Sequence, residues 1–129
     1  GDECIAYLWS EVAGFSRFGY YTGNNSSDGP FVWCGFKPRW IIVKRYDAAD
    51  TGWMIIDSSR NTYNTTTATL TASSANPESS YASTNSYDFL SNGFKVRHDV
   101  STTGYSNASG GGYIFAAFAE TPFKYSTAR

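Results

Sequence analysis

The chain has 129 residues, and its 10 basic and 11 acidic side chains give a net charge of −1 at pH 7. This length predicts a single domain, and the balanced charge argues against a nucleic acid or an anionic membrane as a partner. Only 16% of residues are charged while 18% are aromatic. We therefore expect a surface of hydroxyl, amide and phenol groups, as in extracellular, glycan-facing or particle-associated β-proteins.

Short apolar or aromatic runs, separated by turns rich in Gly and Pro, are typical of β-strands. We expect strands at Ile5–Trp9, Phe31–Phe36, Trp40–Lys44, Trp53–Ile56, Phe94–Arg97 and Tyr113–Ala119. Alternation places Ile41 and Val43 on one face, opposite Trp40. The last run is apolar on both faces and is expected inside a sheet. No window has a helical period, so we predict an all-β antiparallel sandwich of the jelly-roll or concanavalin-like kind, with little helix.

The composition between Ser58 and Tyr87 shifts to Ser, Thr, Asn and Ala, which predicts a long loop region with at most a short edge strand at Thr67–Thr71. A second, flexible loop is expected at Ser106–Gly112. Sandwich loops often carry binding groups, and aromatic side chains suit both sugars and protein contacts. The candidate ligand-binding residues are Arg60, Tyr63, Asn64, Tyr81 and Tyr105. The alternative, solvated loops whose tyrosines merely pack them down, stays equally open.

An internal similarity links the two ends of the chain. Ile5–Glu11 resembles Ile114–Glu120: each is an apolar run that ends at a glutamate and precedes a phenylalanine and a basic residue. We therefore expect residues 1–18 to be a linker or the closing strand of a preceding unit, or a strand beside the real closing strand. Residues 19–129 would then form a single β-sandwich module. Chance similarity between two aromatic strands is the alternative.

Catalytic and metal-binding patterns are weak. His98 is the single histidine, and its phase with Phe94 places it on an apolar face, where structural histidines are commoner than general bases. The acids are scattered, and neither a calcium nor a zinc pattern occurs. Cys4 and Cys34 are expected to be buried free thiols. We predict no catalytic residue, no metal, no cofactor, and a protein that is not an enzyme.

Four ordered segments carry a resemblance: Gly35–Lys44, Trp53–Arg60, Tyr87–Val96 and Asn107–Phe115. Together they are similar to a C-terminal module of bacteriophage tail and tail-fibre-like proteins, an uncharacterised β-sandwich domain often found with concanavalin-like lectin domains. The resemblance covers roughly residues 18 to 129. It supplies no catalytic residues, and its motifs also meet the packing needs of a sandwich.

The resemblance implies a protein of the phage virion, located in the tail and made in the bacterial cytoplasm, in keeping with an N-terminus that lacks the layout of a signal peptide. It implies other virion subunits as partners and a homo-oligomer, a trimer as in fibre tips. The expected function is non-enzymatic recognition of a host-surface glycan or receptor. A purely structural module for virion assembly or decoration is the first alternative, and a surface-polysaccharide hydrolase is the second.

Overall fold

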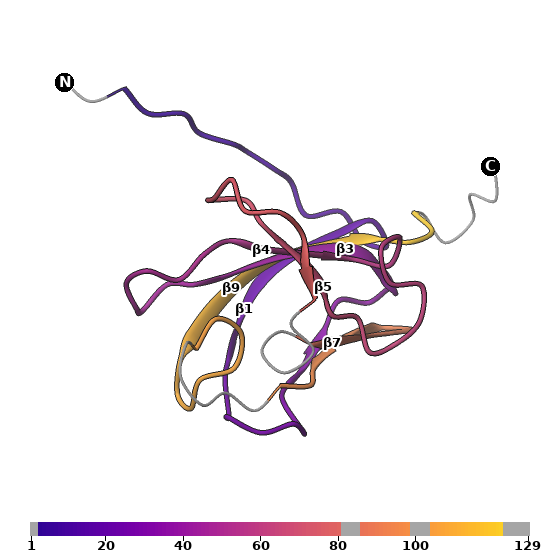
Figure 1. Cartoon of the computed structure of the whole chain (residues 1–129). Helices are drawn as coiled ribbons and strands as arrows, with labels where there is room; N and C mark the ends of the chain where they lie inside the picture. The colour runs from indigo at the N-terminus through magenta and orange to yellow at the C-terminus, as the bar shows by residue number, and fades with distance from the viewer. Residues whose placement is uncertain (1–2, 81–85, 99–103, 123–129) are drawn as a thin grey trace.

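The computed structural model describes residues 3–80, 86–98 and 104–122, and within these ranges every regular element is a strand. The larger sheet has the order β1 (Ser16–Thr22), β9 (Gly112–Ala119), β3 (Pro38–Arg45), β4 (Met54–Asp57), β5 (Ala68–Thr71) and β6 (Ser79–Ser80). The smaller sheet has the order β2 (Phe31–Trp33), β8 (Gly93–Val96) and β7 (Tyr87–Leu90). All pairings are antiparallel. The predicted all-β sandwich is confirmed (Figure 1).

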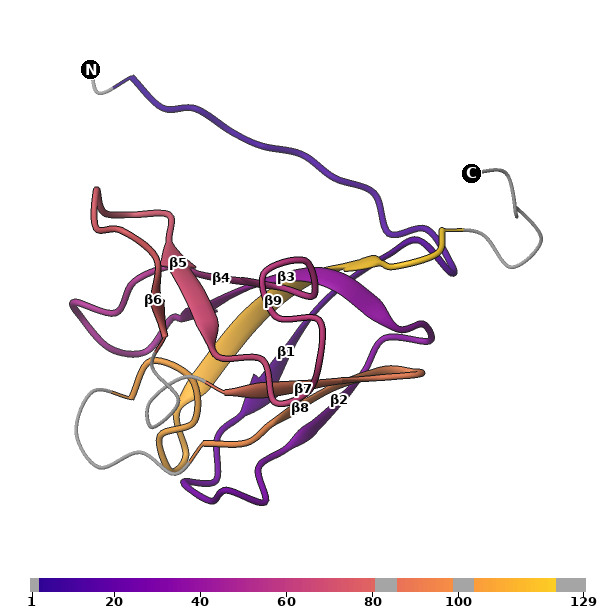
Figure 2. The ribbon, with the colours of Figure 1, turned by 45° about the vertical axis from the view of Figure 1, so that its right-hand side comes forward.

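The core lies between the two sheets, which face each other in Figure 2. Ile41 and Val43 of β3 are fully buried, as are Phe94 and Val96 of β8. The ring of Phe94 meets that of Phe115 edge to face, with 5.3 Å between centroids. Each buried apolar side chain of this size contributes about 1.5–3 kcal/mol, and each ring pair about 0.5–1.5 kcal/mol more. Ile41 and Val43 are buried while Trp40 and Ile42 are only half-buried, so the alternation predicted for β3 is confirmed.

Strand β9 occupies the middle of the larger sheet, as its sequence predicted. It pairs with β1 on one side, where Ile114 faces Tyr20, and with β3 on the other, where Ala116 faces Ile42. Its odd-numbered side chains, such as Tyr113, point into the core and are buried. The even-numbered ones point to the opposite face of the sheet, away from β2, β7 and β8. Because both sets are apolar, the outer face of the larger sheet is apolar as well.

The predicted strand at Ile5–Trp9 was wrong. Residues 3–11 form an extended arm outside both sheets, and each of them is exposed. In both ribbon views the arm leaves the body on the side away from the smaller sheet (Figures 1 and 2). Apolar character alone does not make a strand, because a strand also needs a neighbour for its backbone hydrogen bonds. The expected domain boundary at residue 18 falls inside β1.

The polar region that was expected to be mostly loop contains β5 and β6 and ends at the start of β7. β5 lies between β4 and β6, so it is an inner strand and not the edge strand that was expected at Thr67–Thr71. β7 was not predicted at all, although Tyr87 and Phe89 are buried and alternate with half-buried Asp88. Four-residue strands give too few alternations for a sequence pattern to stand out.

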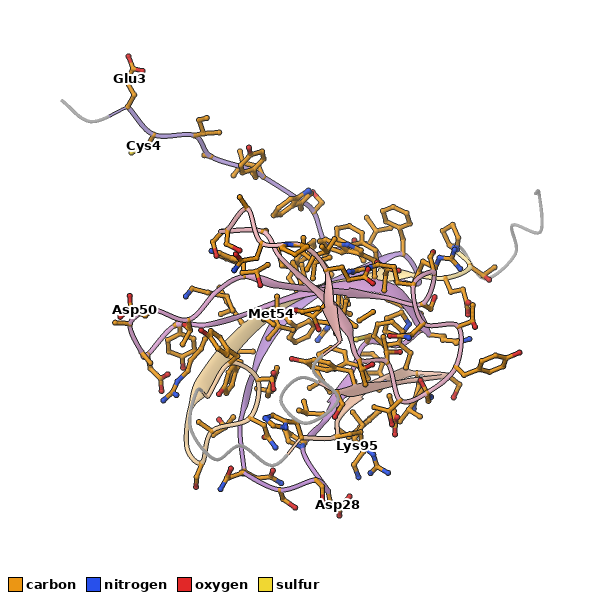
Figure 3. The ribbon with its side chains drawn as sticks, viewed as in Figure 1. Glu3, Cys4, Asp28, Asp50, Met54 and Lys95 are labelled. Atoms are coloured by element: carbon orange, nitrogen blue, oxygen red, sulfur yellow. The ribbon has the colours of Figure 1, made fainter. Side chains whose placement is uncertain are left out.

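The expectation for the cysteines was half right. Both thiols are free, and Cys34 is buried, but Cys4 is exposed. Figure 3 shows Cys4 and Glu3 on the arm, well away from the body of the molecule. Burial raises the pKa of the Cys34 thiol to about 12.

The loop before β9 is held firmly, in contrast to the flexibility expected for Ser106–Gly112. Asn107 is fully buried. Its Nδ2 donates to the backbone oxygens of His98 at 2.6 Å and Ser26 at 2.9 Å. Its Oδ1 accepts from the backbone N–H of Asn24 at 2.9 Å. One buried amide therefore ties together three loops at this end of the sandwich.

Candidate functional site

The predicted site residue Arg60 is engaged within the protein. Its Nε donates to Oδ2 of Asp57 at 2.6 Å, and its other nitrogens donate to Oε2 of Glu78 at 3.3 Å and to the carbonyl of Ile55 at 3.1 Å. Burial acts to raise the pKa of Asp57, but the hydrogen bonds and charge of Arg60 outweigh it, so the pKa lies below the ordinary value. Arg60 therefore fastens β4 to the loop that follows it.

The predicted site residue Asn64 is also engaged. Its Nδ2 donates to the carbonyl of Phe89 at 3.0 Å, and its Oδ1 accepts from the N–H of Phe89 at 2.9 Å. The next residue, Thr65, donates from Oγ1 to Asp88. β7 is the last strand of the smaller sheet. The amide of Asn64 thus closes part of an open sheet edge, and it is not free to grip a ligand.

The remaining predicted site residues do not converge. Tyr63 is 85% exposed and lines a shallow hollow of about 240 Å³ with Asn64, Lys37 and Phe89. Tyr105 is half-buried against the core and does not line this hollow. Tyr81 lies outside the described residues. Among the predicted site residues that the structure describes, Tyr63 alone presents a free side chain to solvent.

A larger site lies between β1 and β2, and the sequence patterns did not predict it. These are the outermost strands of their sheets, and they border the same open side of the sandwich. A groove of about 400 Å³ runs between them, lined by Arg17, Gly19, Tyr20, Phe31, Trp33 and Phe115. We call it the edge groove. Its volume falls within the range of about 300–1,000 Å³ that small-molecule sites occupy.

Two aromatic side chains of the edge groove are exposed. Trp33 is 55% exposed, and Phe31 is nearly half exposed. In β2 the buried Val32 separates the two exposed rings, so the strand holds one side chain in the core and turns two outward. The sequence did not reveal this buried-exposed alternation, because all three residues are apolar.

Arg17 supplies the polar group of the edge groove. Its guanidinium carbon lies 5.2 Å from the centroid of the Trp33 ring, and its Nη1 donates to Oε1 of Glu11 at 2.5 Å. The N–H of Phe18 approaches the other oxygen of Glu11 at 3.4 Å. A cation over an exposed ring gains about 0.5–1 kcal/mol, and an exposed ion pair up to about 1 kcal/mol. These contacts orient Arg17 while leaving further N–H donors for a ligand.

A glycine keeps the floor of the edge groove open. A Cβ at Gly19 would stand 3.0 Å from Cε1 of Phe115, which is closer than side-chain atoms normally pack. Because residue 19 has no side chain, the ring of Phe115 reaches the groove and forms its apolar floor. The groove therefore combines flat rings, an apolar base and one cation.

The chemistry of this set is that of binding. Aromatic faces stack on apolar surfaces while tolerating water at their polar edges, and a guanidinium donates to hydroxyl or carboxylate oxygens. Acid–base hydrolysis of a glycan would need two carboxyl groups, and the residues that line the groove include none. Within the described ranges, no three His, Cys, Asp or Glu side chains gather as a metal site would require. In the same ranges no helix is long and apolar enough to cross a membrane.

Comparison with known proteins places the chain in a family. A family profile described as a domain of unknown function, DUF7483, matches residues 1–122. This match includes the arm, both sheets and the edge groove. Neither curated proteins nor solved structures gave a match. The chain therefore belongs to the DUF7483 family.

Proposed function

We propose that this chain is a non-enzymatic recognition module of a phage tail, and that it binds a host-surface glycan in the edge groove. The observation that carries the proposal is the gathering of exposed Phe31 and Trp33 beside Arg17. Large exposed aromatic clusters are uncommon on soluble proteins and usually mark a binding surface. The phage context rests on the motif resemblance in residues 18 to 129.

A saccharide matches the groove for three physical reasons. The C–H face of a pyranose can stack on Trp33, and its hydroxyls can accept from Arg17. β1 and β2 are outermost strands, so backbone groups along their free sides can bond further hydroxyls. Because Arg17 is already paired with Glu11, the groove carries little net charge, which favours a neutral sugar over a polyanion.

Glycan-array screening with variant proteins tests the proposal. Trp33→Ala removes the stacking surface and is expected to weaken binding by about fivefold to 150-fold, since stacking on an aromatic ring contributes about 1–3 kcal/mol. Tyr63→Ala removes an even more exposed ring from the loop and serves as the control, with binding unchanged. Loss of binding in Tyr63→Ala but not in Trp33→Ala would contradict the proposal and return the site to the polar loop.

The two alternative functions fare differently. The edge groove does not support a polysaccharide hydrolase, because the described residues that line it include no carboxyl pair. A role in assembly is favoured by a separate observation, the apolar outer face of the larger sheet. Assembly and glycan recognition use different surfaces and are compatible in one molecule.

A further inference from the structure

A second hollow lies on the outer face of the larger sheet, beneath the arm. It measures about 620 Å³ and is lined by Tyr7 and Trp9 of the arm together with Trp40, Ile42, Trp53 and Ile114 of the body. We call it the outer hollow. Trp9 stacks on Tyr7 and on Phe18, so the arm forms one wall, while the space between arm and sheet stays open.

The lining of the outer hollow is apolar throughout, and charged side chains are absent from it. The net charge of the whole chain is only −1. A second copy can therefore approach this face without like-charge repulsion and without burying an unpaired charge. A glycan would leave its hydroxyls without partners there, so a protein segment is the better match.

The arm supplies such a segment. Leu8 is 91% exposed and Ile5 is 83% exposed, although both are large apolar side chains. The backbone of residues 4–9 has no hydrogen-bond partner among the described parts of the chain. An apolar strand with unpaired backbone groups is the usual template for pairing with another chain.

The arm also resembles a strand that already packs in this fold. Ile5 and Trp9 correspond to Ile114 and Phe118 in the similarity between Ile5–Glu11 and Ile114–Glu120. Ile114 lines the outer hollow, and Phe118 packs against Trp40 with 5.5 Å between ring centroids. Side chains of these types, at this spacing, therefore already form part of the outer face.

We propose that this chain self-associates by exchanging arms, with the arm of one copy covering the outer hollow of another copy. The contact joins two different surfaces, so it closes either as a reciprocal pair or as a ring of three. It is independent of the edge groove and goes beyond the proposed glycan recognition. The proposed occupant of the outer hollow is the arm of another copy of this chain.

The mass in solution, measured by light scattering after size exclusion, tests the proposal. The wild-type chain is expected at two or three times the 14.2 kDa of one copy, and Leu8→Glu at 14.2 kDa. Because Leu8 contacts little of its own body, this variant keeps the wild-type circular dichroism spectrum. Tyr63→Glu, equally exposed but far along the chain, is the matched control and keeps the wild-type mass.

Mixing two variants separates arm exchange from simple face-to-face packing. Leu8→Glu damages only the arm, and Trp53→Glu damages only the hollow, so each is expected to be monomeric alone. In the mixture, the intact arm of Trp53→Glu meets the intact hollow of Leu8→Glu, and a heavier species returns. A monomeric wild-type chain at every attainable concentration, or no recovery in the mixture, would overturn the proposal. Glycan binding by Leu8→Glu is expected to be unchanged, so failure of one proposal is distinguishable from failure of the other.

Discussion

Asn107 shows how strongly one buried amide can determine the shape of three loops. Its side chain satisfies the carbonyls of His98 and Ser26 and the N–H of Asn24, all through polar atoms that are removed from water. A buried polar group that loses its partner costs about 1–3 kcal/mol. The contribution of Asn107 therefore lies less in its own bonds than in the backbone groups that it keeps satisfied.

We predict that Asn107→Ala lowers the free energy of unfolding by about 2–4 kcal/mol, because several buried backbone groups lose their partner at once. Chemical denaturation monitored by tryptophan fluorescence measures this loss. Asn76→Ala, at an exposed loop position, is the control and stays within about 0.5 kcal/mol of wild type. Equal stability of Asn107→Ala and wild type would contradict this account of the loops.

The ion pair of Asp57 and Arg60 is a residue-scale feature with a pH signature. The pKa of Asp57 is lowered from 3.8 in the folded chain, so the carboxylate form is stabilised by folding. Stability from this group is present above the ordinary pKa and is lost as the pH falls through the folded pKa.

Asp57→Asn is expected to be about 1–3 kcal/mol less stable than wild type at about pH 7, because charged hydrogen bonds to Arg60 are lost. The difference should shrink as the pH falls from about 5 towards 2, where the wild-type carboxyl becomes protonated. Denaturation curves at a series of pH values measure it, with Glu3→Gln on the exposed arm as control. A difference that is independent of pH would contradict the assignment.

At the scale of single elements, the open edge of β7 is covered by the loop that precedes β5. Asn64 bonds both backbone groups of Phe89, and Thr66 forms a bridge with Tyr87. Two short segments, distant in sequence, thus protect each other. Only the fold could show this, because an Asn-rich loop looks the same in sequence whether or not it covers a strand.

Hydrogen exchange tests the covering of β7. In Asn64→Ala the amide proton of Phe89 loses its acceptor, and we expect its protection to fall by about tenfold to a hundredfold, as for a lost hydrogen bond of about 1–3 kcal/mol. Amides of the inner strand β8 keep their protection. Thr62→Ala, in the same loop, is the control with unchanged exchange. Unchanged protection at Phe89 in Asn64→Ala would contradict the assigned bond.

Strands with long apolar alternation were predictable, and short or unpartnered segments were not. β3 and β9 each have eight residues; the faces of β3 and the inner position of β9 followed from sequence. β7 has only four, and the arm has the composition of a strand without the neighbour that would make it one. Whether each segment forms a strand was decided by the presence of a pairing partner and not by its β-propensity.

The same limit applies to the site. Arg60 and Asn64 were sensible choices by residue type. However, Arg60 is hydrogen-bonded to β4, and Asn64 is hydrogen-bonded to β7. Arg17 and Trp33 lie 16 positions apart on strands of different sheets, and only the closing of the sandwich brings the guanidinium over the ring. No local sequence pattern encodes this contact between Arg17 and Trp33.

On the scale of the whole molecule, the two sheets close over a core that includes the thiol of Cys34. This side chain is 4% exposed, and its backbone N–H donates to Asn92 at 2.9 Å. Its reactivity therefore reports how often β2 separates from the rest of the sandwich.

In the variant Cys4→Ser, Cys34 is the only thiol of the chain. We predict that it reacts with an aromatic disulfide reagent about a thousandfold more slowly in the folded protein than in urea, because burial and a pKa near 12 both suppress the thiolate at about pH 8. Absorbance of the released thiolate gives the rate. Reaction as fast as in the unfolded chain would contradict the closed sandwich.

NMR titration of the labelled chain with a glycan selected on the array tests most directly whether recognition occurs between β1 and β2. We predict that shift changes gather at residues 17–20 and 31–33, with the indole N–H of Trp33 moving most and the amides of residues 60–66 remaining still. Shifts gathered at residues 60–66, with Trp33 unmoved, would contradict the claim.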